Sequence, residues 1–409
     1  YCVISLPKCV IQTSLVRDEE IVAYQRKILK LKIRVQMRQP KDAGEPSISE
    51  TSTSHQGRML ETFEVGPCKD AREMGFLIGQ RFSHLIRSRV AGDAILQQQL
   101  LPFASTPQAQ LLIQSLTTAN SERYPKYWDE MLGTAEGSGV SVLEILLLNF
   151  RKEILPFLPN AEATPVELTN DDCSDISLVC SSLAVAAHNE DANVALVGHT
   201  YLIRATLSDG QLFTAYTYAG EIPSCAFGFN SCGLAFMLNS VPPTKKEIVA
   251  AGLGRNFISR DLLEASSLGD ALQRLRLSNA SVGHSYNLVD IRNRKIVNVE
   301  TASGNRFSIH EVGETPFFHA NMYLHLQVDQ VKDENSFRRQ KRAALFSTKS
   351  VQDMLLLLGD SADEKYPIYM TGPTLYTLCT VLIDLDKQTL GIIQGNPKKG
   401  EILQEFELF

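Results

Sequence analysis

One cysteine in the interior of the chain offers the clearest chemistry in this sequence. Cys173 stands in Asp172-Cys173-Ser174-Asp175, and a hydrophobic run over 176–187 separates it from the acidic pair Glu190-Asp191. This layout suits a cysteine that becomes a chain terminus when the bond before it is cut. A terminal cysteine carries its thiol nucleophile and a base, the freed α-amine, on the same residue. Cys173 is therefore a candidate nucleophile.

His188 is the histidine closest to Cys173 along the chain. Because the thiolate is the reactive form of cysteine, a neighbouring base would activate Cys173 even in an uncut chain. A cysteine amidase that is never processed, with His188 as its base, is therefore a second hypothesis. A third interpretation treats Cys173 as a small buried hydrophobe. The protein would then be a catalytically silent binding or structural member of its fold.

Charge and missing motifs exclude several other classes of function. The formal net charge of −6 gives no basic surplus for nucleic acid. The chain has no G-x-x-x-x-G-K-[ST], H-E-x-x-H or G-x-S-x-G motif, and none of its eight cysteines forms a C-x-x-C pair. His188 and His199 are eleven residues apart, which is poor spacing for metal ligands. We expect no cofactor, no metal and no nucleic-acid partner.

The first part of the chain has the composition of a disordered extension. Residues 42–58 are polar and rich in Ser and Thr, so we predict that 1–57 does not fold. Residues 21–41 contain seven Lys or Arg and no acid, a pattern that leaves organelle targeting open. No run reaches the ~18 apolar residues of a membrane span. We expect an intracellular, cytoplasmic protein without membrane contact.

The pattern of apolar residues predicts an α+β fold in one domain over 60–405. A strand at 60–65 precedes helices over 73–155, and strands dominate after Cys173. Antiparallel hairpins with helices grouped between them indicate α+β layering. The predicted hairpin turns lie at 209–210, 230–233, 292–293 and 386–387, the further helices at 256–275 and 338–358, and one short strand at 195–197.

Six short segments occur in a fixed order between residues 60 and 400. They are Gly66-Pro67 with Glu73-Met74-Gly75 and Gly79, Leu148-Asn149-Phe150-Arg151-Lys152-Glu153, Cys173-Ser174, Asn189-Glu190-Asp191, Phe229-Asn230-Ser231-Cys232-Gly233, and His319-Ala320-Asn321. Together they resemble the acyl-coenzyme A:6-aminopenicillanic acid acyltransferase family (peptidase family C45) of N-terminal nucleophile hydrolases. The family's spacing is also matched, because Asn189 stands sixteen residues after Cys173.

The resemblance implies a four-layer αββα sandwich and a role for each matched residue. Cys173 would be the nucleophile after autocatalytic cleavage between 172 and 173, with its new α-amine as general base. Asn321 would donate to the oxyanion of the tetrahedral intermediate, and Asp191 would orient the amine or the substrate. Supporting roles are expected for Asp172, His188, Asn189 and Asn239.

Three positions depart from the family pattern or compete with it. Asp172 stands where the family often has glycine, and its carboxylate could assist or slow the N-to-S acyl shift. Pro373-Thr374 stands where the fungal acyltransferase has Ser-Arg, which bears on β-lactam acyl transfer. Cys180-Ser181-Ser182 also resembles the cleavage motif, but the spacing to Asn189 favours Cys173.

The expected function is amide hydrolysis or acyl transfer through a thioester on Cys173. The partner would be a small-molecule amide or acyl-coenzyme A substrate. Hydrolysis and transfer share one acyl-enzyme and differ in the acceptor that attacks it. The fragments 1–172 and 173–409 are expected to stay associated as a heterodimer if the chain is cut.

Overall fold

The computed structural model describes residues 59–159, 172–223 and 226–408. The disordered extension predicted for 1–57 lies outside these residues, as does most of the polar connector before Cys173. Both residues of the expected cleavage junction, Asp172 and Cys173, are described. Among the described residues, no helix is both long and apolar enough to cross a bilayer.

The described residues form two β-sheets, one of eight strands and one of six. In sheet order, the larger contains β1 (Thr62–Val65), β4 (Thr200–Thr206), β5 (Leu212–Tyr218), β6 (Phe227–Asn230), β7 (Leu234–Ser240), β8 (His284–Asp290), β9 (Lys295–Ala302) and β10 (Arg306–Glu311). The smaller contains β11 (Phe317–His319), β2 (Ser174–Cys180), β3 (Leu183–Asn193), β12 (Leu375–Asp384), β13 (Thr389–Ile393) and β14 (Gln404–Glu407).

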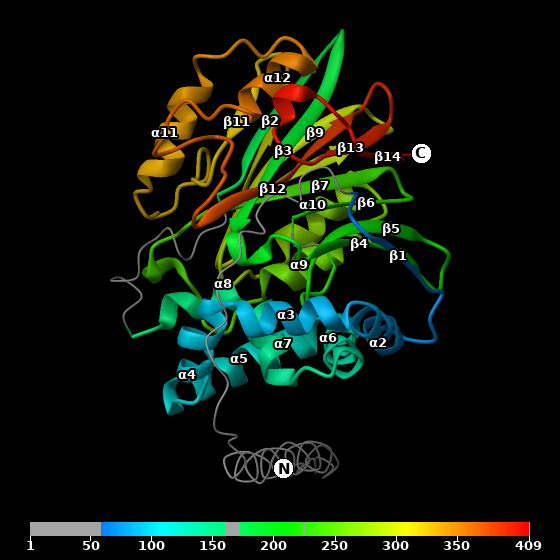
Figure 1. The fold of residues 1–409 in the computed structure, drawn as a ribbon, viewed down its shortest axis with the longest axis vertical. Helices are drawn as coiled ribbons and strands as arrows, with labels where there is room; N and C mark the ends of the chain where they lie inside the picture. The colour runs from blue at the N-terminus through cyan, green and yellow to red at the C-terminus, as the bar shows by residue number, and fades with distance from the viewer. Residues whose placement is uncertain (1–58, 160–171, 224–225, 409) are drawn as a thin grey trace, which may run out of the picture. The chain divides into compact units, whose positions relative to one another are not determined.

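The described helices lie outside the two sheets (Figure 1). Those on the side of the larger sheet are α2 (Ala71–Arg81), α3 (Ser83–Gly92), α4 (Leu101–Ala104), α5 (Pro107–Arg123), α6 (Pro125–Ser138), α7 (Val142–Asn149), α8 (Arg151–Ile154), α9 (Arg255–Leu262) and α10 (Leu268–Arg276). Those on the side of the smaller sheet are α11 (Glu334–Ala343) and α12 (Val351–Leu358).

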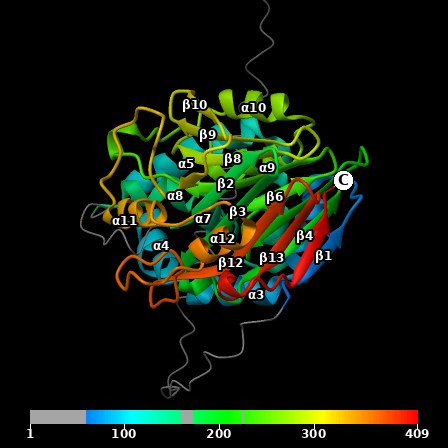
Figure 2. The ribbon, with the colours of Figure 1, turned by 90° about the horizontal axis from the view of Figure 1, so that it is seen from above.

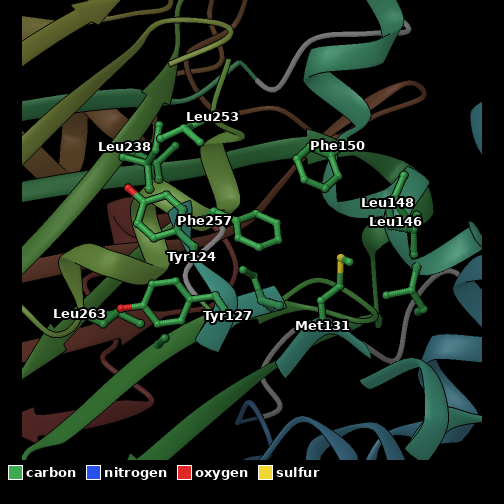
Figure 3. Close-up of a cluster of buried hydrophobic side chains, with 14 of the residues drawn as sticks. Tyr124, Tyr127, Met131, Leu146, Leu148, Phe150, Leu238, Leu253, Phe257 and Leu263 are labelled. Carbon is green, nitrogen blue, oxygen red and sulfur yellow. The ribbon is translucent and has the colours of Figure 1, made fainter. Parts of the chain in front are cut away.

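The alternation of side chains along β3 shows how the layers form. Ala184 and Ala186 belong to a hydrophobic core between the two sheets. Val185 and Ala187 point the opposite way, into a second core beneath α11 and α12. A third core, part of it shown in Figure 3, fills the space between the larger sheet and its helices. Three cores separate four layers, which confirms the αββα sandwich (Figures 1 and 2).

Glycines bring α2 and α6 into close contact. A Cβ on Gly75 would lie 1.9 Å from the carbonyl oxygen of Glu130, and one on Gly133 would lie 2.1 Å from that of Arg72. Both distances are far inside van der Waals contact. Residues without a Cβ are therefore required on both helices at this contact. The glycine-containing helix predicted from 73 to 79 is confirmed.

The structure corrects several details of the predicted elements. The strand expected at 195–197 is wrong, because the Asn193 side chain caps a 3₁₀ turn at Val194–Leu196 by accepting from the Ala195 amide (2.9 Å). The helix expected over 338–358 is two helices, α11 and α12. The four predicted hairpin turns are confirmed, although β1 and β4 pair in parallel within the otherwise antiparallel described sheets.

Candidate active site

Cys173 lies immediately before β2, in the interior of the sandwich. Its side chain is buried, and its Sγ donates toward Oε2 of Glu190 (3.4 Å) and the carbonyl oxygen of Asp191 (3.8 Å). The amide of Asp172 donates to the same Asp191 carbonyl (3.1 Å). The junction expected to be cut is therefore fixed against the end of β3.

Strand alternation divides the four polar residues of β3 between two faces. His188 and Glu190 continue the face of Ala186, toward the larger sheet, where the Tyr218 hydroxyl donates to Glu190 Oε1. Asn189 turns toward α12, and its Nδ2 donates to the carbonyl oxygen of Leu358 (2.8 Å). The sequence predicted supporting roles for both His188 and Asn189, but only His188 lies beside the thiol. Asn189 anchors the outer helical layer.

His188 is held between two carboxylates. Its Nδ1 contacts Oδ1 of Asp175, and its Nε2 lies 2.9 Å from Oε2 of Glu190. Burial lowers the pKa of His188, but the charges and hydrogen bonds of Asp175 and Glu190 outweigh it and raise the pKa to about 10. At neutral pH the imidazole is therefore protonated and donates from both nitrogens. Glu190, rather than His188, is the group in direct contact with the Cys173 thiol.

Asp191 is buried, and only one of its two carboxyl oxygens accepts a hydrogen bond from the described residues. Thr377 on β12 donates to its Oδ1, whereas Oδ2 is buried without a hydrogen-bond partner among the described residues. Burial raises the pKa of Asp191 to about 8, although the Thr377 hydrogen bond and the charge of Arg339 act in the opposite direction. The carboxyl group can therefore accept a further donor, such as an amine formed at Cys173.

Arg339 on α11 joins the residues around the junction, and sequence reasoning missed it. The side chain is fully buried. Its Nη1 donates to the carbonyl oxygen of Cys173 (2.8 Å) and its Nη2 to Oδ1 of Asn321 (2.8 Å). Nη2 also lies 3.8 Å from Oδ1 of Asp172, whose Oδ2 accepts from Asn335 (2.7 Å). One guanidinium thus contacts Asp172, Cys173 and Asn321.

The side chains of Asn321, the predicted oxyanion donor, and Asn239, a predicted supporting residue, differ in their hydrogen bonding. Nδ2 of Asn321 donates to the carbonyl oxygen of Ser240 (2.9 Å). Asn239, next to Ser240 on β7, is fully buried, and neither its Nδ2 nor its Oδ1 has a hydrogen-bond partner among the described residues. Since β7 alternates, Asn239 shares the face of Met237 toward the space between the sheets. Asn239 is therefore the asparagine whose amide is open to a further ligand.

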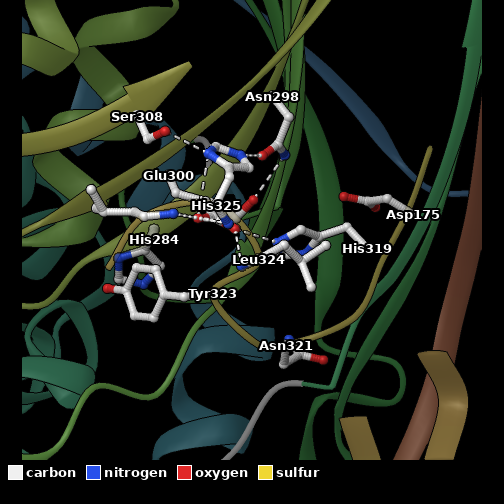
Figure 4. A network of polar contacts seen from close by, with 12 residues as sticks. Asp175, His284, Asn298, Glu300, Ser308, His319, Asn321, Tyr323, Leu324 and His325 are labelled. Atoms are coloured by element: carbon white, nitrogen blue, oxygen red, sulfur yellow. Dashed lines mark hydrogen bonds and ion pairs between the residues drawn. The ribbon is translucent and has the colours of Figure 1, made fainter. Parts of the chain in front are cut away.

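A polar network holds the loop that carries Asn321 (Figure 4). The buried carboxylate of Glu300 accepts from the amides of Leu324 (2.6 Å) and His325 (3.0 Å) and lies 3.4 Å from Nε2 of His319. Burial raises the pKa of Glu300, but these donors outweigh it and leave the pKa below its ordinary value. Glu300 therefore fixes the chain on both sides of Asn321.

The thiol of Cys173, an imidazole nitrogen of His188 and a carboxylate oxygen of Glu190 lie within 4.8 Å of one another. No other group of three or more such donors is found in the described part of the chain. Sγ of Cys173 (3.4 Å) and Nε2 of His188 (2.9 Å) both lie at hydrogen-bonding distance from Oε2 of Glu190, so we interpret the three residues as an acid–base group. His199 does not share the partners of His188. Its Nε2 contacts the hydroxyl of Ser88 on α3 (3.0 Å).

The rival nucleophile Cys180 lies at the far end of β2. Its side chain is partly exposed, and its thiol contacts the hydroxyl of Ser182 (3.5 Å). Neither Asp191 nor Arg339 is among its recorded hydrogen-bond partners in the described residues. The contacts with Glu190, Asp191 and Arg339 are therefore made by Cys173.

Comparison with known proteins places the chain in a family. The model of the family "acyl-coenzyme A:6-aminopenicillanic acid acyl-transferase" matches residues 180–399, more than half of the chain. The beta-alanyl-dopamine/carcinine hydrolase of Drosophila melanogaster is 27% identical over 367 residues, covering 80% of this chain and 92% of that protein. The 40 kDa form of the acyltransferase of Emericella nidulans is 29% identical over 172 residues, covering 41% of this chain and 44% of that protein.

Among solved structures, a Caenorhabditis elegans N-acylethanolamine-hydrolyzing acid amidase ortholog is similar with a TM-score of 0.38 and 12% identity, over 52% of this chain and 92% of that one. The family match includes His188, Asn189, Asp191, Asn239 and Asn321, and begins seven residues after Cys173. The chain belongs to the acyl-coenzyme A:6-aminopenicillanic acid acyltransferase family.

Proposed function

We propose that this protein is an N-terminal-cysteine amide hydrolase that cuts its own Asp172–Cys173 bond and then hydrolyses small amides through a thioester on Cys173. The observation that carries the proposal is the position of the Cys173 thiol. It lies against Glu190 and Asp191 at the junction itself, and Arg339 ties that junction to Asn321.

Burial of the junction supports processing before turnover. Asp172 and Cys173 are only 3% and 2% exposed, so a substrate cannot reach the thiol in the arrangement that the structure describes. Cleavage would free the chain end at Cys173 and give it an α-amine with an ordinary pKa of about 7.7–8.0. The unpartnered Oδ2 of Asp191 is a suitable acceptor for that amine.

Turnover then follows from the groups around the new terminus. The α-amine takes the thiol proton, and Sγ attacks the substrate carbonyl carbon. The Asn239 amide, buried without a protein partner among the described residues, can donate to the oxyanion. The C–N bond breaks as the leaving amine takes a proton, which leaves a thioester. Water then adds to the thioester and releases the acid and the Cys173 thiol.

A β-alanyl amide is the substrate class that the comparisons favour. The Drosophila hydrolase matches along 92% of its own length, whereas the Emericella acyltransferase matches along 44%. The resemblance to the acyltransferase is weakened where Pro373-Thr374 replaces its Ser-Arg pair. We therefore propose hydrolysis of β-alanyl amines as the main activity, with acyl transfer from acyl-coenzyme A as the second candidate.

The test uses the purified full chain with carcinine, with β-alanyl-dopamine, and with phenylacetyl-coenzyme A plus 6-aminopenicillanic acid. We expect release of β-alanine from the first two and no penicillin product from the third. Intact-mass measurement should show fragments 1–172 and 173–409.

Two cysteine variants serve as the matched pair for this test. Cys173→Ala should abolish both cleavage and hydrolysis, and Cys180→Ala should retain both. Full hydrolysis by a single uncut species would refute processing. Hydrolysis retained in Cys173→Ala would refute the assignment of the nucleophile.

A further inference from the structure

Glu190 occupies a position that the proposed turnover does not use. Its Oε2 accepts from Sγ of Cys173 (3.4 Å) and from Nε2 of His188 (2.9 Å), while Oε1 accepts from the hydroxyl of Tyr218. The side chain is 2% exposed. Both carboxylate oxygens are therefore oriented by donors, and the oxygen that faces the thiol cannot rotate away without breaking them.

A chain of polar contacts across the two sheets stiffens this arrangement. Behind His188, Asp175 accepts through Oδ1 from the imidazole and through Oδ2 from Nδ2 of Asn287 on β8. Oδ1 of Asn287 accepts in turn from Nδ2 of Asn298 on β9 (2.8 Å). Because His188 stays protonated between its two carboxylates, it supports Glu190 as a donor and cannot itself take the thiol proton near neutral pH.

The intact chain lacks the base that a mature N-terminal cysteine would use. Before cleavage the nitrogen of Cys173 is an amide, so no α-amine is present to accept the thiol proton. Sγ donates toward the Glu190 carboxylate and the Asp191 backbone carbonyl, and of these two acceptors the carboxylate is the base.

We propose that Glu190 takes the proton of the Cys173 thiol in the intact chain and so starts cleavage of the Asp172–Cys173 bond. The inference rests on the proposed self-processing. It assigns Glu190 a catalytic role in cleavage, with His188, Tyr218 and Asp175 as the residues that position it.

The step balances without any further reactant except water. The proton moves from Sγ to Glu190 Oε2, and the sulfur electron pair forms a bond to the carbonyl carbon of Asp172. The C–N bond then breaks, and the nitrogen of Cys173 takes the proton back from Glu190. The product is a thioester between Asp172 and Sγ. Water breaks its C–S bond, which leaves a carboxylate on Asp172, a thiol on Cys173 and a protonated α-amine.

Ordinary acidities explain why Glu190 suits cleavage better than turnover. The pKa of a glutamic acid is about 4.3 and that of a thiol about 8.5, so the transfer is uphill by about four units. A reaction that each molecule performs once can be slow. Repeated turnover needs a base matched to the thiol, and the α-amine released by cleavage supplies it with a pKa of about 7.7–8.0.

The experiment follows the cleavage of freshly translated full chain by intact mass at pH 7, comparing wild type, Glu190→Gln and Glu153→Gln. Glu153 is an equally buried acid that accepts from the amide of Arg255 (2.8 Å), away from Cys173. We expect cleavage of Glu190→Gln to slow by about 100-fold or more, in the usual range for loss of a general base. Glu153→Gln should stay within a few-fold of wild type.

Two further measurements separate chemistry from folding. Raising the pH ionises the thiol directly, so cleavage of Glu190→Gln should recover by about tenfold per pH unit up to the pKa of the thiol, which a misfolded chain would not do. Hydroxylamine cleaves thioesters and should not accelerate cleavage of Glu190→Gln, because the block comes before the thioester. Besides Glu190, the titratable and charged groups near Sγ that also bear on the pH dependence of cleavage are Asp172, Asp191, His188 and Arg339.

Each outcome bears on a distinct claim. Cleavage of Glu190→Gln at the wild-type rate, or a hydroxylamine-sensitive thioester that accumulates in it, would overturn the role of Glu190 and leave the proposed function intact. A wild-type chain that remains uncut would overturn self-processing and the Glu190 proposal together. Amide hydrolysis, measured on the same sample, reports separately on the enzymatic activity.

Discussion

Arg339 on α11 donates through Nη1 to the carbonyl oxygen of Cys173 at 2.8 Å, which ties the outer helical layer to the expected cleavage point. The same guanidinium holds Oδ1 of Asn321 at 2.8 Å. Cys173 and the loop that carries Asn321 are therefore fixed relative to each other by one buried cation, although Asn321 stands 148 positions after Cys173 in the sequence.

Replacing Arg339 with alanine should disrupt both processing and stability. The variant would leave the Cys173 carbonyl, Asn321 and the nearby Asp172 carboxylate without their shared partner. In a Cys173→Ala background, where every chain stays intact, we expect a loss of about 3–5 kcal/mol in the free energy of unfolding by urea titration. In the Cys173 background, intact mass should show the uncut chain.

Arg338 provides the control on the same helix. It is exposed and pairs with Glu334 one turn earlier, so Arg338→Ala should change the free energy of unfolding by less than about 1 kcal/mol and leave cleavage unaffected. Equal losses in the two variants would contradict the role given to Arg339.

Replacing Asn239 with leucine should raise the stability of the chain and lower its amidase activity. Both polar atoms of its side chain are buried without partners among the described residues, and such groups cost about 1–3 kcal/mol each in desolvation. Asn239→Leu should therefore raise the thermal midpoint of the intact Cys173→Ala chain. With Cys173 present, it should lower kcat for the amide by about 10²–10³-fold, as expected for loss of an oxyanion donor.

The matching change at Asn189 should have the opposite effect on stability. Asn189 donates to the carbonyl oxygens of Leu358 (2.8 Å) and Ile368 (3.2 Å) and accepts from Thr380 (2.7 Å). Asn189→Leu would leave these two carbonyl oxygens and the Thr380 hydroxyl without their hydrogen bonds to Asn189 and so lower the thermal midpoint. A destabilised Asn239→Leu variant with full activity would contradict the oxyanion role.

Local patterns in the sequence predict the α+β layering, whereas the four-layer αββα sandwich and the roles of the site residues are implied by the family resemblance. The alternation along β3 already places His188 and Glu190 on one face and Asn189 and Asp191 on the other. The strand period alone therefore separates His188, which faces the larger sheet, from Asn189, which faces α12. Glu190 shares the face of His188.

The rest of the site depends on contacts that no local pattern contains. Arg339 stands in a helix with many other cations, and nothing in its neighbourhood distinguishes it from the exposed Arg338. Tyr218 and Asn287 reach Glu190 and Asp175 only because the two sheets pack face to face. Such pairs could be predicted only from the packing of the sheets or from covariation among relatives.

The α2–α6 contact gives a test of packing away from the site. A Cβ added at Gly133 would lie 2.1 Å from the carbonyl oxygen of Arg72. This oxygen belongs to the backbone of α2, so it cannot move away without shifting the helix. Gly133→Ala should cost about 1–3 kcal/mol or more of unfolding free energy through overpacking. Gly92 ends α3 with nothing within 4 Å of its added Cβ, so Gly92→Ala should be neutral or slightly stabilising in the same urea titration. Similar effects at both glycines would show that α2 and α6 do not touch as described.

Asp191 should make the intact chain less stable as the pH rises. Its pKa is about 8 when folded and about 3.9 when unfolded, so between these values the folded chain holds a proton that the unfolded chain has lost. The contribution of Asp191 to the free energy of unfolding therefore falls from about pH 4 to about pH 8 and is constant above that pH. His188, with a folded pKa of about 10, adds a fall between about pH 6.5 and 10 that parent and variant share.

Asp191→Asn in the Cys173→Ala background should remove the first of these two slopes. The variant cannot ionise, so its urea midpoint should be close to that of the parent at pH 4.5 and higher at pH 9, by on the order of a few kcal/mol in unfolding free energy. Asp209→Asn, at the exposed turn between β4 and β5, should follow the parent at every pH. A parent and an Asp191→Asn variant with parallel profiles would mean that Asp191 is ionised in the folded chain at neutral pH.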